Sequence, residues 1–118
     1  MTLNEYQDRA LDTCLQESRN TSYMLLNLVG EVGEFSGKIG KYIRKGEAKI
    51  SENDLRLYGP ASRERDIDLM KEAGDILWQL SGLCYFMGWR LEDVASQNLA
   101  KLADRKKRGV IDGNGDER

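Results

Sequence analysis

The chain has 118 residues, with 18 Lys and Arg against 20 Asp and Glu, so its formal net charge is -2 and its length suits a single domain. This balance argues against a nucleic-acid partner, and the sequence contains neither an apolar run long enough to span a bilayer nor a signal-peptide pattern. The absence of histidine excludes Ser-His-Asp triads, HExxH zinc sites and Glu-x-x-His di-iron sites.

The two cysteines favour a reducing compartment. Cys14 and Cys84 are far apart in the chain and belong to no Cys-x-x-Cys pair, so neither a disulfide nor a zinc site is expected. Free, buried thiols are typical of a reducing environment. Because no leader or membrane segment is expected either, we predict a cytoplasmic protein with no membrane partner.

Helical periodicity begins at the N-terminus. We expect a first helix over about residues 3–17, opened by Thr2 with Glu5 three positions later, which is the capping-box pattern. A second and longer helix is expected over about residues 22–45, with Gly46 as its C-terminal stop.

Four glycines lie on one strip of this second helix: Gly30, Gly33, Gly37 and Gly40. Each costs roughly 1 kcal/mol relative to alanine in a helix interior, so something must offset about 4 kcal/mol. A bare strip lets another helix approach closely, and we expect a neighbouring helix, from this chain or from a partner subunit, to pack there. The alternative is that the helix bends or breaks near Gly30.

Residues 47–63 contain the only proline and mix charges without sustained periodicity. We therefore expect a long surface connection, with one short helical turn after Ser51. Two further helices are expected beyond it, each stopped by a glycine: residues 64–87 before Gly88, and residues 91–107 before Gly109.

No segment alternates with a period of two residues, and no internal repeat is present. The predicted architecture is one all-α domain over residues 1–109, resembling a four-helix bundle. The polar sequence VIDGNGDER that follows is expected to form a flexible tail over residues 110–118.

Two pairs of carboxylates lie at the margins of the apolar stripes of the central helices, Glu31 with Glu34 and Glu72 with Asp75. If those stripes face each other, four carboxylates meet at one edge of the core. Such a cluster needs a partner, because desolvating a carboxylate costs several kcal/mol and like charges repel. Mg²⁺, a hard cation that prefers oxygen ligands, would supply it. The alternative is that all four acids are ordinary solvated surface residues.

The last helix carries groups of the opposite sign. Asn98, Lys101 and Arg105 share one side of it with apolar residues, so we expect them to approach the bundle, where the two cations could bind phosphates. Alternatively, Lys101 and Arg105 are solvated residues that interact favourably with the negative end of the helix dipole.

Four segments of the sequence together resemble the MazG-like family of all-α nucleoside triphosphate pyrophosphohydrolases. They are LNEYQDRALDT at the start, GEVGE with Glu31 and Glu34, EAGD with Glu72 and Asp75, and NLAKLADR with Asn98, Lys101 and Arg105. Each motif is short, but their order and their placement on all four helices make the combination fairly specific.

The resemblance implies Mg²⁺-dependent hydrolysis of a (deoxy)nucleoside triphosphate to the monophosphate and pyrophosphate, in nucleotide-pool control or housecleaning. Mn²⁺ is an expected substitute for Mg²⁺. The catalytic metal ligands would be Glu31, Glu34, Glu72 and Asp75. The implied assembly is a homodimer or a dimer of dimers that completes the bundle, with the base pocket partly built across the interface.

The substrate contacts expected from this resemblance and from position are Lys38, Asn98, Lys101, Arg105 and, for the base, Gln7 near the stripe of the first helix. The aromatic residues include candidates for stacking on a base, although an aromatic at helical spacing is more often part of a core. These candidates are Tyr6, Tyr42, Trp78, Tyr85 and Trp89.

The sequence departs from the family pattern in two places. The family motif often reads EExxE, whereas Gly30 stands at its first position here, and the separation of Glu34 from Glu72 is long for the family. Neither departure removes one of the four acids. They keep a second interpretation open, in which the chain is a catalytically silent dimerisation or nucleotide-sensing module of the same fold.

Overall fold

The structure is a computed structural model that describes residues 1–118. It is all-α, as expected, except for one small hairpin that was not predicted. Its elements follow in the order α1 (Leu3–Leu11), the 3-10 turn η1 (Gln16–Ser18), α2 (Thr21–Arg44), β1 (Ala48–Ile50), β2 (Leu55–Leu57), α3 (Ser62–Phe86) and α4 (Leu91–Arg108).

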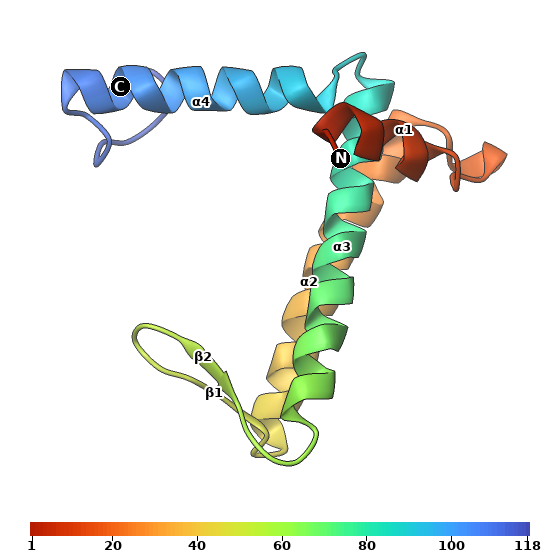
Figure 1. Ribbon diagram of the computed structural model, residues 1–118, viewed down its shortest axis with the longest axis vertical. Helices are drawn as coiled ribbons and strands as arrows, with labels where there is room; N and C mark the ends of the chain where they lie inside the picture. Colours follow the sequence, from red (N-terminus) through yellow and green to blue (C-terminus); the bar gives the residue numbers. More distant parts are fainter.

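Helices α2 and α3 run antiparallel side by side, α1 lies across one end of this pair, and α4 points away from it (Figure 1). The four helices therefore do not enclose one core, and the expected bundle is not closed within a single chain. The radius of gyration is 17.6 Å, whereas a compact chain of this length would have about 13.5 Å.

The ends of α1 show how local hydrogen bonds set a helix boundary. The Thr2 hydroxyl accepts from the Glu5 backbone N–H at 3.0 Å and the Glu5 carboxylate accepts from the Thr2 N–H at 2.9 Å, which confirms the capping box. The prediction that this helix continues to residue 17 is wrong. It ends at Leu11, and the Thr13 hydroxyl then donates to the Ala10 carbonyl at 2.7 Å as the chain turns.

The other three helices lie close to their predicted spans. The side chain of Asn20 caps the start of α2 by accepting from the Tyr23 N–H at 2.7 Å. Helix α4 ends at Gly109, whose φ of 72° places it in the left-handed region where glycine carries no steric penalty.

A β-hairpin occupies the segment that was expected to be an irregular connection with one helical turn after Ser51, and that prediction is wrong. Strand β1 pairs antiparallel with β2, so that Ala48 faces Leu57 and Ile50 faces Leu55. The turn is held by Ser51, whose N–H donates to the Asp54 carbonyl at 2.8 Å. The prediction failed because each strand has three residues, which is too short for a period of two to be visible in the sequence.

The core is small and lies where α1, the start of α2 and the end of α3 meet. Met24 is fully buried there, and Cys84 is 2% exposed. A Cβ at Gly82 would lie 2.4 Å from the Met24 sulfur, so this glycine gives the Met24 side chain its place between α2 and α3. Both cysteines are free, Cys84 buried and Cys14 half-buried. None of the helices combines the length and apolarity needed to cross a bilayer.

One face of α2 has no partner in the chain. A Cβ added at any glycine of its strip would meet nothing within 4 Å, so the expected neighbouring helix does not come from this chain. The helix is continuous through Gly30, which removes the alternative of a break there. Exposed apolar residues border the strip, and together they form what we call the outer face of α2: Leu25, Leu26, Val29, Gly30, Val32, Gly33, Gly37 and Gly40.

Candidate metal centre

Three carboxylates meet between α2 and α3, about midway along the pair. One oxygen from each of Glu31, Glu72 and Asp75 lies within 4.8 Å of the others. Glu72 and Asp75 are three residues apart and so share one face of α3, while Glu31 approaches from the half-buried face of α2. Two antiparallel helices thereby bring together acids that are about forty positions apart in the sequence.

Glu34 lies beside this trio. It is exposed one turn further along α2, and its carboxylate is a neighbour of Glu31. Burial raises the pKa of Glu31, and the negative charges of Glu34, Asp75 and Glu72 raise it further. The folded chain thus holds Glu31 where its ionised form is disfavoured.

Two oxygens of the cluster are buried without a hydrogen-bond partner, Oε2 of Glu31 and Oε2 of Glu72. An unpartnered buried carboxylate oxygen costs free energy, and a cation or a proton can remove that cost. A set made entirely of carboxylate oxygens fits a hard divalent cation such as Mg²⁺ and provides no nitrogen or sulfur for softer metals.

The tyrosine of the first helix is influenced by the charge of the cluster. Tyr6 on α1 is half-buried, and burial together with the negative charge of Asp75 raises the pKa of its hydroxyl. The phenol of Tyr6 therefore stays protonated at neutral pH.

Lys38 already occupies part of the site. Its Nζ lies 2.6 Å from Oε1 of Glu72 and 2.7 Å from Oδ2 of Asp68. Hydrogen bonds to Asp68 and Glu72 raise the pKa of Lys38, and the Lys38 ammonium lowers the pKa of Asp68. No sequence motif pointed to Asp68, although its position four residues before Glu72 places it on the same face of α3.

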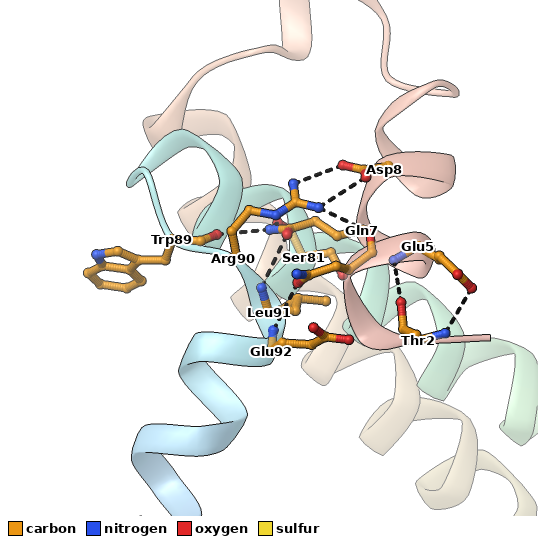
Figure 2. A network of polar contacts seen from close by, with 10 residues as sticks. Thr2, Glu5, Gln7, Asp8, Ser81, Trp89, Arg90, Leu91 and Glu92 are labelled. Carbon is orange, nitrogen blue, oxygen red and sulfur yellow. Dashed lines mark hydrogen bonds and ion pairs between the residues drawn. The ribbon is translucent and has the colours of Figure 1, made fainter.

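Gln7 has a structural role rather than the expected contact with a base. Its side chain is fully buried, and its amide donates to the carbonyls of Ser81 at 3.2 Å and of Trp89 at 3.0 Å. Its own oxygen accepts from the Leu91 N–H at 3.1 Å. Figure 2 shows this amide at the centre of the joint between α1, the end of α3 and the start of α4. Both amide hydrogens are used, so none remains for a base.

A bidentate ion pair supports the same joint. The Arg90 guanidinium contacts both oxygens of Asp8, at 2.8 and 3.0 Å, and it also donates to the Asn4 carbonyl. The indole of Trp89 points away from this network (Figure 2). The polar contacts therefore fix the direction in which α4 leaves α3.

The cations of α4 do not approach the acidic cluster of their own chain, contrary to the prediction, because α4 points away from α2 and α3 (Figure 1). Asn98 and Lys101 instead line a groove of about 550 Å³ together with Trp89. The indole of Trp89 is exposed at this groove, and it is the aromatic side chain most accessible to a ligand among the stacking candidates.

The tail covers Arg105, the last of the expected substrate contacts on α4. Arg105 is 4% exposed and donates to an Asp116 oxygen at 2.8 Å, while Lys101 pairs with the same oxygen at 3.1 Å. Both contacts lower the pKa of Asp116. Residues 110–118 are thus folded back onto the end of α4, and the expected phosphate contacts are paired with a carboxylate of the chain itself.

Comparisons with known proteins relate the chain to a nucleotide-hydrolysing family. The profile of the family described as "MazG nucleotide pyrophosphohydrolase domain" matches residues 19–110. The "Gene 37 protein" of Mycobacterium phage L5 is 34% identical over 125 aligned positions that cover all of both chains. No solved structure gives a significant match.

Proposed function

The chain belongs to the MazG nucleotide pyrophosphohydrolase family, and we propose that it hydrolyses a (deoxy)nucleoside triphosphate to the monophosphate and pyrophosphate. In this reaction water adds to the α-phosphorus, the bond from that phosphorus to the bridging oxygen breaks, and pyrophosphate leaves. The observation that carries the proposal is the convergence of Glu31, Glu72 and Asp75, with two orphaned buried oxygens among them.

The acidic cluster fits Mg²⁺, with Mn²⁺ as a substitute. The residues that would hold the ion are Glu31, Glu72 and Asp75, with Glu34 as a further ligand from the exposed side of α2. When bound, Mg²⁺ supplies positive charge that activates a water molecule and neutralises the charge developing on pyrophosphate. The protein's own contribution is to hold these carboxylates on two packed helices, so that little reorganisation accompanies the reaction.

The phosphate contacts come from two places in the fold. Lys38 lies at the edge of the acidic cluster. Asn98, Lys101 and Arg105 lie on α4, which points away from the cluster of its own chain (Figure 1). We propose that they serve the acidic cluster of a second copy, with Trp89 available to stack on the base across the groove.

This arrangement requires a homodimer or a dimer of dimers. Only 13 of the 118 residues are buried in the isolated chain, which is too small a core for an independent domain of this length. The outer face of α2 is apolar, open and lined by glycines, which suits close packing of another helix. A nucleotide substrate and two free thiols suit the cytoplasm.

The decisive experiment incubates the protein with a panel of ribonucleoside and deoxynucleoside triphosphates in Mg²⁺ and separates the products by ion exchange. We expect monophosphate and pyrophosphate in equal amounts from at least one nucleotide. Asp75→Asn should abolish turnover, whereas Glu64→Gln, which changes an exposed acid of α3, should leave it unchanged. Orthophosphate with a diphosphate as products, or full activity of Asp75→Asn, would contradict the proposal.

The alternative function is a catalytically silent nucleotide-sensing or dimerisation module. It is favoured by Gly30, which stands where the family motif often has an additional acid. In that case the same panel yields no products, while a non-hydrolysable triphosphate still binds in calorimetry.

A further inference from the structure

Lys38 lies between two carboxylates that differ in environment. Glu72, a member of the acidic cluster, has a side chain that is 13% exposed and whose second oxygen has no partner. Asp68 lies outside the cluster, is 42% exposed, and accepts a second hydrogen bond from the Tyr42 hydroxyl at 3.1 Å. Both carboxylates are nevertheless within 2.7 Å of the same ammonium.

This ammonium is the only cation in the structure that is paired with a carboxylate of the cluster, since neither Glu31 nor Asp75 forms an ion pair. It therefore offsets repulsion that would otherwise act among the three acids. A divalent cation at the free second oxygen of Glu72 would share this carboxylate with Lys38, and two positive charges on one carboxylate repel each other.

We propose that Lys38 is a built-in counterion that competes with the divalent cation for Glu72, and that Asp68 with Tyr42 is the place where Lys38 remains once the cation is bound. This inference rests on the proposed metal centre and goes beyond it by assigning Asp68 and Tyr42 as positioning residues. Asp68 can retain the ammonium because its contact with Lys38 does not involve a cluster oxygen.

The Lys38→Gln variant tests the competition. Removing the ammonium should strengthen Mn²⁺ or Mg²⁺ binding by about tenfold, which corresponds to about 1.4 kcal/mol. The same variant should unfold at a lower temperature in the presence of a chelator, because the acids lose their counterion. If Lys38 had only a structural role, its removal would lower stability and would weaken cation binding at the same time.

The measurements are isothermal titration calorimetry with each cation and thermal unfolding in chelator, neither of which depends on turnover. Lys41→Gln is the matched control, because Lys41 is an exposed lysine of α2 without an ion pair. Unchanged or weakened cation binding in Lys38→Gln would overturn the proposal. So would equal changes in Lys38→Gln and Lys41→Gln.

Asp68→Asn tests whether Asp68 holds Lys38 once the cation is bound, and this test does not depend on the folding of Lys38→Gln. It leaves Lys38 to Glu72 alone, so cation binding should weaken several-fold beyond the effect of Asp66→Asn, an exposed control on α3. In a Lys38→Gln background this excess should disappear, because nothing remains to be retained. An excess that persists without Lys38 would mean that Asp68 acts only through its own charge.

The outcomes also separate this inference from the proposed function. If the wild type binds the cations and hydrolyses a nucleotide but Lys38→Gln behaves like Lys41→Gln, the counterion role fails alone. If no variant binds a cation and none releases pyrophosphate, both proposals fail together.

Discussion

The polar joint around Gln7 allows a quantitative test of how the chain holds α4 in place. Gln7→Ala removes the three hydrogen bonds of this buried side chain, to the carbonyls of Ser81 and Trp89 and from the N–H of Leu91. At a net value of about 1 kcal/mol for each bond, the loss is about 3 kcal/mol, and the three orphaned backbone groups place this at the lower end of the expected cost.

A loss of this size is large for a chain with so small a core. For a domain of about this length, 1 kcal/mol corresponds to about 4 °C in melting temperature, so Gln7→Ala should melt about 12 °C below the wild type. Circular dichroism at a fixed protein concentration measures this shift, and the concentration must match because self-association adds to apparent stability. Gln16→Ala, an exposed glutamine of η1 without a side-chain hydrogen bond, is the control.

The opposite result would support the expectation from the sequence that Gln7 contacts the base. If Gln7→Ala melts with the wild type while the KM for the nucleotide rises, Gln7 contacts the base and the structural interpretation of its hydrogen bonds is refuted. If Gln7→Ala melts at a lower temperature but its folded fraction retains the wild-type KM, Gln7 stabilises the joint and does not contact the base.

Three further predictions concern the cluster, the tail and the outer face of α2. Burial and neighbouring charges raise the pKa of Glu31, so the wild-type protein in the presence of a chelator loses stability as the pH rises through that pKa. Glu31→Gln should therefore be more stable than the wild type at pH 7, and this advantage should fade on acidification. A melting-temperature advantage that stays constant with pH would be inconsistent with this cause. Asp116→Asn should release Lys101 and Arg105 and so lower the KM for a triphosphate several-fold. Asp112 has no such contacts, so Asp112→Asn should leave the KM unchanged. Equal KM values for the two variants would mean that the tail has no effect on substrate binding. Leu at Gly33 and Gly37 meets open space within one chain, so helicity should persist while self-association in sedimentation velocity is reduced, and an unchanged sedimentation coefficient would show that assembly uses another surface.

Features set by neighbours in the sequence could be predicted well. The capping box of α1, the span of α2 and the stop of α4 at Gly109 each depend on residues within one or two turns. The acids of α2 and α3 could be placed because helical periodicity fixes the face on which each one lies. The association of Glu31, Glu72 and Asp75 needs only that the two helices pack side by side, which their length and apolar faces favour.

Features that depend on distant contacts could not be predicted. Nothing near Gln7 in the sequence indicates that it meets backbone groups some eighty residues later, and its position beside an apolar stripe suits a ligand contact equally well. The direction of α4 is decided by that same joint, so the destination of Lys101 and Arg105 was predicted incorrectly for a single chain. The hairpin was missed because its pairing is supported by a turn at Ser51 and not by a long alternating pattern.

The lysine within the acidic cluster has a consequence for the life of the protein in the cell. Many metalloproteins depend on their ion to fold, which ties their synthesis to metal supply. Here the side chain of Lys38 brings a positive charge to Glu72 as soon as α2 and α3 pack. On the proposed metal centre, a newly made chain could therefore fold before a divalent cation binds, so that ion availability would set its activity without determining whether the polypeptide survives.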